Sequence, residues 1–264
     1  MKKIKLAVIA LCFALCLALL AGCQTTAETG SAGEEDSEQS TVYIIATDTT
    51  FAPFEYQDEN GDYVGIDIDL LAAIAADQGF QYELQPLGFD AACAALESQQ
   101  CDGVIAGMSI TEERKSRYDF SDPYFDSGVV LAAKADSTVE SLEDLRGQAV
   151  AVKNGTEGAA YAESIAEEYE LELRYFDESP LMYQEVITGN AAACCEDYPV
   201  IGYGIATGNL ELKMVGEMQA GSSYGFAVST GQNAELLEMF NTGLANLVAS
   251  GAYDEIVGTY IQAG

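Results

Sequence analysis

The strongest constraint on the fold is an order of segments that occurs twice along the chain. Residues 89–107 run through a helix-like stretch and a polar turn into an apolar strand, and residues 179–197 repeat that order. Strands that alternate with helices are typical of an α/β layer with a largely parallel sheet. We therefore expect an α/β protein with two lobes, each built from one set of these segments.

Apolar periodicity and capping residues predict the individual elements. Residues 66–78 have apolar side chains at helical spacing and Gly79 follows them, which predicts a helix with a left-handed C-terminal cap. The other helices expected in the two lobes are residues 90–98, 157–169 and 180–188. The expected strands are residues 42–47, 82–87, 102–106, 149–153, 171–176 and 191–195.

The later part of the chain predicts how the lobes are joined. β-rich stretches near residues 128 and 223 are expected to link them, and amphipathic helices follow at residues 233–249 and 253–261. If these helices return to the first lobe, that lobe is discontinuous. The expected division is lobe 1, residues 42–127 plus 223–264, and lobe 2, residues 128–222, with a hinge segment at each end of lobe 2 and a ligand cleft between the lobes.

The first 41 residues differ in composition from the rest of the chain. Three lysines precede an apolar run over residues 6–20, and Leu20-Ala21-Gly22-Cys23 follows, which indicates a secretory signal that ends in a lipobox. A signal anchor is disfavoured because the run is shorter than the ~20 residues of a membrane span. Similarity to bacterial lipoprotein signals implies that residues 1–22 are cleaved and that Cys23 is lipidated outside the cytoplasmic membrane. Residues 23–41 are then a flexible acidic tether.

The composition excludes several classes of protein and partner. Hydrophobic residues make up 49% of the chain, enough to bury a core, so a disordered protein is excluded. With 43 acidic against 11 basic residues the net charge is −32, and the protein should repel nucleic acid and anionic lipid head groups. The acidic residues are dispersed along the chain, so we interpret them mainly as a source of solubility.

Histidine and cysteine usage argues against metal and His-based catalytic chemistry. The chain has no histidine and no Cys-x-x-Cys motif, so we expect no metal site, no cofactor and no catalytic triad. The adjacent Cys194 and Cys195 lie in an apolar strand and are expected to be small buried side chains. Whether Cys93 and Cys101 form a disulfide is left open.

Residues 105–128 contain a candidate carboxylate-binding site. An apolar strand opens there into Gly107 and the hydroxyl group of Ser109, and Arg114 follows, in a chain with four arginines. The planar guanidinium suits bidentate binding of a carboxylate; the alternative is a surface arginine paired with a neighbouring acid. Ligands bind beyond the carboxyl ends of strands in open α/β sheets. We therefore expect these residues to face Asp197, at the end of the repeated unit, across a cleft.

Several short motifs occur in a specific order over residues 42–262. They are Ala46-Thr47-Asp48 with Phe51-Ala52-Pro53-Phe54-Glu55, Gly65-Ile66-Asp67-Ile68-Asp69-Leu70, Ile110-Thr111-Glu112-Glu113-Arg114, Asp119-Phe120-Ser121-Asp122-Pro123-Tyr124, and Gly155-Thr156. Together they resemble the bacterial extracellular solute-binding proteins of polar amino acid ABC transporters, family 3, which include glutamine-, histidine- and lysine/arginine/ornithine-binding proteins. The resemblance implies a type II periplasmic-binding-protein fold, with two α/β lobes joined by a two-strand hinge, that closes on one amino acid.

The resemblance assigns roles to the residues that hold the ligand backbone. Arg114 is expected to form a bidentate pair with the α-carboxylate, and Ser109 and the backbone amide of Glu157 to donate to the same group. Asp197 is expected to accept from the α-ammonium, helped by the carbonyl oxygen of Gly107. A zwitterion needs donors at one end and an acceptor at the other, so this division is chemically consistent.

The resemblance also implies which residues line the rest of the pocket. Asp48 is expected to accept from a glutamine amide or from a cationic side chain and to reject glutamate. Phe51 and Phe89 are expected to sandwich the aliphatic stem, and Thr156 belongs to the same ligand-binding set. Glu157 is a carboxylate where the family often has an uncharged residue. At a helix N-terminus it can turn outward, so we expect only its backbone N–H to contact the ligand.

These residues predict a lipid-anchored binding protein of an ABC importer rather than an enzyme. Glutamine is the favoured ligand, and a basic amino acid (arginine, lysine or histidine) is the alternative. The expected partners are the transmembrane permease subunits, which receive the closed form, and the membrane, through Cys23; we expect a monomer that binds no nucleic acid. The rival functions are a sensory receptor for the same ligand and an exported dehydratase on the same fold; Arg114 together with Asp197 favours binding over turnover.

Overall fold

The computed structural model of the protein describes residues 41–261. The expected signal peptide, Cys23 and the tether up to residue 40 lie outside the described residues. Among residues 41–261, no helix combines the length and the hydrophobicity that a membrane crossing needs.

The first five-stranded sheet is built around the first strand of the described chain. β1 (Val42–Thr47) pairs in parallel with β5 (Gln81–Pro86) on one side and β6 (Gly103–Val104) on the other. β13 (Ala227–Ser229) and β7 (Tyr118–Phe120) continue the sheet in antiparallel pairing. The strand order is therefore β5-β1-β6-β13-β7.

Alternate side chains of β1 pack on different helices. Ile45 lies in a core with α1 (Ile66–Gln78) and α6 (Ala234–Ser250). Ala46 lies in a second core with α2 (Phe89–Glu97). Successive side chains of a strand point to opposite faces of its sheet, so both faces are covered and β1 is buried on each. The helix α6 brings the C-terminal part of the chain back onto the sheet formed by its first strands.

The second five-stranded sheet has the order β10-β9-β11-β8-β12. β9 (Ala149–Lys153) pairs in parallel with β10 (Glu172–Phe176) and with β11 (Ala193–Asp197). β8 (Phe125–Lys134) is antiparallel both to β11 and to β12 (Leu212–Tyr224). This sheet carries the second repeat of the strand–helix order.

Three helices cover the second sheet. α3 (Glu157–Tyr169) packs on one face, and α4 (Ser179–Ile187) and α5 (Tyr198–Ala206) pack on the other. The remaining described elements are the three-stranded sheet of β2 (Thr50–Phe51), β3 (Glu55–Gln57) and β4 (Tyr63–Val64), the short 3-10 helices η1 (Arg114–Ser116) and η2 (Leu142–Leu145), and the last helix α7 (Ala252–Tyr260).

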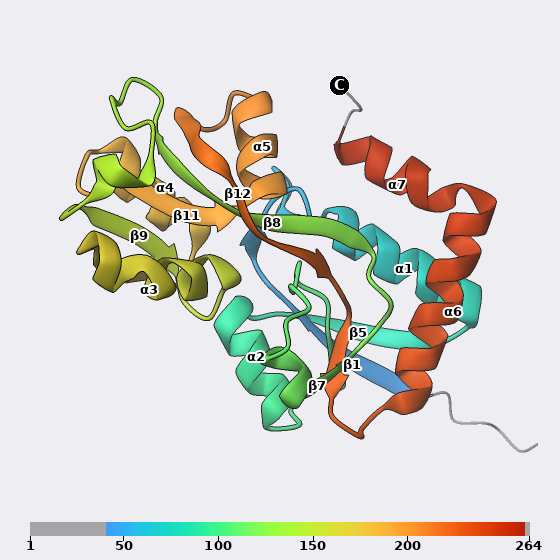
Figure 1. Ribbon diagram of the computed structural model, residues 1–264. Helices are drawn as coiled ribbons and strands as arrows, with labels where there is room; N and C mark the ends of the chain where they lie inside the picture. Colours follow the sequence, from blue (N-terminus) through green and yellow to red (C-terminus); the bar gives the residue numbers. More distant parts are fainter. Residues whose placement is uncertain (1–40, 262–264) are drawn as a thin grey trace, which may run out of the picture. The chain divides into compact units, whose positions relative to one another are not determined.

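β8 and β12 carry the chain into and out of the second sheet. They pair with each other along their length, from Lys134 with Leu212 to Phe125 with Tyr224, with two register shifts. Figure 1 shows the two strands leaving the second sheet side by side. At its end β12 reaches the first lobe, where Tyr224 forms an isolated bridge with Ser109. We propose that this strand pair is the hinge and that the lobes divide near residues 128 and 222.

The α/β fold predicted from the sequence is confirmed, but the prediction of a largely parallel sheet is wrong. Each five-stranded sheet has two parallel and two antiparallel pairings. The reason is connectivity. β8 and β12 run in opposite directions between the sheets, whereas parallel neighbours need a crossover connection. No helix was expected over residues 198–206, where the structure has α5, although proline is well placed in the first turn of a helix.

The four cysteines of the described residues are free thiols. Cys93 and Cys101 therefore form no disulfide in this structure. Cys194 and Cys195 are fully buried on opposite faces of β11, where each belongs to a different core. Burial raises the pKa of both thiols, so they act as small apolar side chains, as the sequence predicts.

Candidate functional site

One pocket is lined by all nine residues that the sequence predicts for the ligand site. Six of them belong to the first lobe and three to the second. The pocket also includes two residues that were not predicted, Ala106 and Glu196. The predicted residues are Asp48, Phe51, Phe89, Gly107, Ser109, Arg114, Thr156, Glu157 and Asp197.

The pocket lies where strands of both sheets end. Asp48 directly follows β1, Gly107 comes shortly after β6, and Asp197 is the last residue of β11. Parallel strands present their carboxyl ends at one edge of a sheet, which is where ligands bind in open α/β folds. The two sheets therefore bring together side chains that are far apart in the sequence.

Gly107 fills a place that a larger residue does not fit. Its φ is +51°, in the left-handed region, and an added Cβ would lie 2.4 Å from the ring of Phe51. Its amide donates a hydrogen bond of 2.7 Å to Oδ2 of Asp67. Glycine is thus required both by the backbone conformation and by the close approach of an aromatic ring that lines the pocket.

Arg114 is not a surface arginine, because only 7% of it is exposed. Its Nη1 donates to the carbonyl oxygen of Ser109 at 2.9 Å and its Nη2 to the carbonyl oxygen of Gly155 at 3.0 Å, so it connects the two lobes. The guanidinium carbon lies 5.2 Å from the ring centre of Phe89. A guanidinium has five N–H donors, and those not used by the two carbonyls are available to a ligand carboxylate.

Asp197 is a buried carboxylate that accepts a hydrogen bond from the last residue of β12. The hydroxyl of Tyr224 donates to Oδ2 of Asp197 at 2.6 Å, and the hydroxyl of Ser127 donates to the oxygen of Tyr224 at 3.0 Å. Burial, with the neighbouring charge of Glu196 as the next cause, raises the pKa of Asp197 to about 7. A positively charged group placed beside Asp197 would stabilise its ionised form.

Lys153 is a pocket-adjacent residue that the sequence reasoning missed. It is the last residue of β9, it is 1% exposed, and its ammonium forms an ion pair with Oδ2 of Asp48. The ammonium also lies 5.4 Å from the ring centre of Phe51. The available signal was a lysine that ends an otherwise apolar strand two residues before the Gly155-Thr156 motif.

Glu196 is a second residue that was missed. It is 1% exposed and accepts hydrogen bonds from the hydroxyls of Ser179 at 2.9 Å and Tyr183 at 3.0 Å. Burial raises its pKa, and the charge of Lys153 opposes that rise. The signal in the sequence was its position next to Asp197 at the end of an apolar strand.

The start of α3 forms the remaining wall of the pocket. Thr156 caps this helix, with its Oγ1 accepting from the amide of Ala159 at 3.2 Å. A Cβ on Gly158 would lie 2.8 Å from the carbonyl oxygen of Cys195, so only glycine allows α3 to approach β11 this closely. Thr156 and Glu157 line the pocket, so the N-terminus of α3 lies at its edge, and a helix N-terminus favours an anion. That the amide of Glu157 contacts the ligand stays a prediction.

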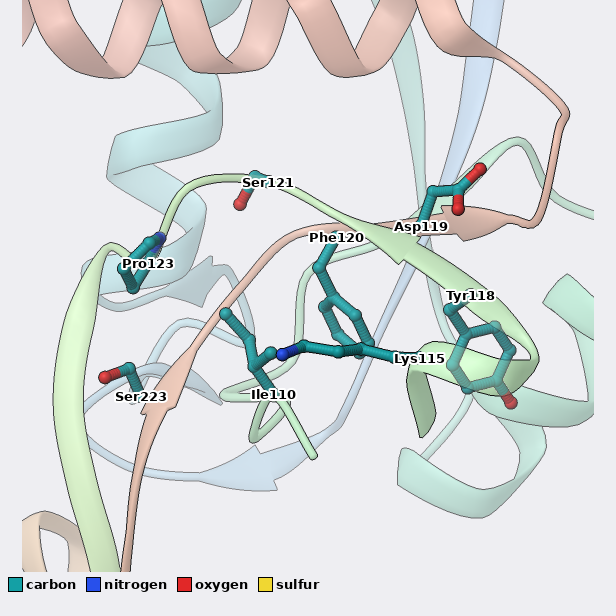
Figure 2. A pocket seen from close by; sticks show the side chains of 8 residues that line it. All are labelled: Ile110, Lys115, Tyr118, Asp119, Phe120, Ser121, Pro123 and Ser223. Atoms are coloured by element: carbon teal, nitrogen blue, oxygen red, sulfur yellow. The ribbon is translucent and has the colours of Figure 1, made fainter. Parts of the chain in front are cut away.

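A wider pocket on the first lobe is a poorer candidate. Its polar side chains already have partners: Lys115 pairs with Glu112, Ser121 donates to the carbonyl of Asp122, and Ser223 donates to Asp126. None of the nine predicted ligand residues lines it. Figure 2 shows its lining residues, which are Ile110, Lys115, Tyr118, Asp119, Phe120, Ser121, Pro123 and Ser223.

Two α/β lobes with a charged pocket at their strand ends define a ligand-binding protein with the type II periplasmic-binding-protein fold, as the sequence predicts. The chain belongs to the bacterial extracellular solute-binding proteins, family 3, whose family model matches residues 43–263.

Individual relatives differ in the amino acid that their names specify. The chain is 31% identical to the ABC transporter glutamine-binding protein GlnH of Bacillus subtilis (strain 168), over 99% of this chain and 98% of the relative. It is 30% identical to the arginine-binding extracellular protein ArtP of the same organism, over 91% and 94% of the two chains. A solved structure of an ancestral arginine-binding protein bound to glutamine is 39% identical, with a TM-score of 0.77 over 84% of this chain and 98% of that chain.

Proposed function

We propose that the protein binds L-glutamine in the pocket and delivers it to the permease of an ABC importer. The observation that carries the choice of glutamine is the buried ion pair between Asp48 and Lys153. The relatives named above are binding proteins for glutamine or arginine, which supports an amino acid ligand and binding rather than turnover. We further propose that lipid on Cys23 anchors the protein to the outer face of the cytoplasmic membrane, and that it acts as a monomer.

The ends of an amino acid zwitterion match two opposite charges that line the pocket. The guanidinium of Arg114 offers donors to the α-carboxylate, and Asp197 offers an acceptor to the α-ammonium. Each charge-assisted hydrogen bond contributes roughly 1.5 to 3 kcal/mol net, and micromolar affinity needs about 8 kcal/mol. Three or four such bonds are therefore sufficient, provided that closure of the lobes excludes water.

The Asp48–Lys153 pair favours a neutral side chain over a cationic one. Oδ2 of Asp48 is engaged by Lys153, and its Oδ1 accepts from the amide of Thr49 at 2.6 Å. The charge of Asp48 is thus already balanced, and a cationic ligand would bring a second positive charge close to the buried ammonium. A glutamine amide carries no net charge and can both donate to a carboxylate and accept from an ammonium.

Arginine is the second candidate, because acids outnumber bases around the pocket. Asp48, Glu157, Glu196 and Asp197 line it together with Arg114, and Lys153 adjoins it. A pocket whose surrounding residues carry a net negative charge attracts a cationic ligand. Asp48 is the group that such a ligand would contact if Lys153 moved away.

Calorimetric titration with a panel of amino acids tests the proposal. We expect glutamine to bind at least about tenfold more tightly than arginine, lysine or histidine, a difference of about 1.4 kcal/mol or more. Glutamate should bind most weakly, because its side chain would meet Asp48 and Glu196. A higher affinity for arginine than for glutamine would contradict the proposed ligand, and binding of no amino acid would contradict the proposed function.

Replacing Lys153 by methionine should shift the preference toward arginine. The change leaves Asp48 without its buried partner, so a cationic side chain can supply the missing charge. We expect the ratio of glutamine to arginine affinity to fall at least about tenfold. Lys213→Met is the matched control, because Lys213 pairs with Glu140 and does not line the pocket. An unchanged ratio in Lys153→Met would show that the ion pair does not select the side chain.

A further inference from the structure

Two carboxyl groups are buried together in the first lobe next to the pocket. Glu55 of β3 and Asp67 of α1 are both 0% exposed. They meet because the amide of Asp67 donates to the carbonyl oxygen of Phe54 at 2.9 Å. Gly65 permits this approach, since a Cβ there would lie 2.1 Å from the same oxygen.

The two groups have unequal sets of partners. Oδ2 of Asp67 accepts from the amide of Gly107 at 2.7 Å and from the hydroxyl of Tyr124 at 2.8 Å. By contrast, both oxygens of Glu55 and Oδ1 of Asp67 receive no hydrogen bond from another group among residues 41–261. Three orphaned carboxylate oxygens in a closed interior would be costly if both groups were ionised.

This cost is lowered if one of the two carboxyl groups keeps its proton. Glu55 and Asp67 are buried beside each other with three oxygens that lack a partner, and a carboxyl that keeps its proton becomes a donor to a neighbouring carboxylate. Burial raises the pKa of Asp67 to about 6 and raises that of Glu55 well above its ordinary range. The charged groups that face Glu55 are Asp67, Asp48 and Lys153, and the first two oppose its ionisation. Glu55 is therefore the member that holds the proton. Tyr124 and Tyr253 also face Asp67.

We propose that protonated Glu55 donates to Asp67 and that this carboxyl pair positions Gly107 in the wall of the ligand pocket. The inference rests on the proposed function in one respect, that the ligand ammonium contacts the peptide of Gly107. Gly107 has no side chain to anchor it, and its amide is held by Asp67. Asp67 is in turn oriented from both sides, by Tyr124 and by Glu55. Glu55 and Asp67 are positioning residues, since neither lines the pocket.

The shared proton can be detected without any ligand. In the unfolded chain Glu55 ionises near its ordinary pKa of 4.5, whereas in the folded protein it keeps its proton to higher pH. Above pH 5, and until the pH reaches the raised pKa of Glu55 in the folded protein, this group alone makes the unfolding equilibrium constant rise by up to about tenfold per pH unit, because the unfolded state binds fewer protons. Glu55→Gln has no proton to lose and keeps the donor to Asp67.

Denaturant unfolding of the full chain and of Glu55→Gln should therefore diverge with pH. We expect the two proteins to have similar stability at pH 5. Toward pH 8 the unfolding constant of the unaltered chain should rise relative to that of Glu55→Gln, by up to about tenfold per pH unit. Asp197 and Glu196 also contribute to the pH dependence of stability, but they do so in both chains, so their contributions cancel in the comparison. Parallel profiles would mean that Glu55 is ionised in the fold and would overturn the proposal. The result does not depend on which ligand binds, so it separates this inference from the proposed function.

Ligand affinity tests the positioning role. Glu55→Gln should bind glutamine within about threefold of the unaltered chain, and Glu55→Met, which lacks a donor, should bind at least about tenfold more weakly. Glu112→Gln is the matched control, because it removes an exposed carboxylate that pairs with Lys115. Equal losses in Glu55→Gln and Glu55→Met, or no loss in Glu55→Met, would overturn the positioning role. If Glu55→Met does not fold, a loss of about tenfold or more in Glu55→Gln, which keeps the donor, would by itself overturn the positioning role.

Discussion

Replacing Arg114 by alanine is expected to weaken glutamine binding by at least about 100-fold, or roughly 2.7 kcal/mol. The guanidinium is the pocket's planar donor for a ligand carboxylate, and two charge-assisted hydrogen bonds of roughly 1.5 to 3 kcal/mol each account for a loss of this size. The same change removes the bonds to the carbonyl oxygens of Ser109 and Gly155, and the second of these runs from the first lobe to the second. Calorimetric titration of the variant measures the effect.

Two further variants separate geometry from charge. Arg114→Lys keeps a positive charge but loses the planar guanidinium and its paired N–H donors, so we expect a smaller loss of glutamine affinity, about tenfold. Arg117→Ala removes a neighbouring arginine that pairs with Glu97 and Glu113 on the surface, and it should leave affinity unchanged. Arg114→Ala that binds within about threefold of the unaltered chain would remove Arg114 from the ligand site.

Glutamine affinity is expected to fall steeply as the pH is lowered below 7. In the ligand-free protein burial and the charge of Glu196 raise the pKa of Asp197 to about 7, so its carboxyl is protonated below that pH. A protonated carboxyl cannot pair with an ammonium, and binding must then release the proton. The expected loss is about tenfold per pH unit, which amounts to roughly 100-fold between pH 8 and pH 5.

Titrations at several pH values, with and without Asp197, isolate this effect. Asp197→Asn should lose about 100-fold in affinity at pH 8 and show a much flatter dependence on pH. Tyr224→Phe removes the hydrogen bond that lowers the pKa of Asp197, so its pH midpoint should move upward. If the pH profiles of the unaltered chain and Asp197→Asn coincide, another group is responsible for the dependence.

Local structure was largely predictable from the sequence. The predicted helix bounds of α1 and α3 agree with the structure, because helical spacing and terminal caps are properties of neighbouring residues. The cap positions include Gly79 after α1 and Thr156 before α3. The mixed direction of the sheets was not predictable in this way, because it depends on how β8 and β12 run between the lobes.

The residues of the candidate site that belong to short sequence motifs or follow predicted strands could be identified from the sequence. Asp48, Arg114 and Asp197 were identified from ordered motifs and from strand ends, and the structure places all three around one pocket. Their roles toward a ligand stay predictions. The sequence by itself determined the family, the strand–helix order and the residue types offered to a zwitterion.

Only the tertiary structure decided how the charged groups are paired. Asp48 and Lys153 are 105 positions apart, and nothing in either local pattern indicates that they form a buried ion pair. Glu55 and Asp67 likewise look like ordinary polar residues of two motifs until the fold buries both. The physical reason is that the cost of a buried charge depends on what surrounds it in space, and those surroundings come from segments that are distant in the chain.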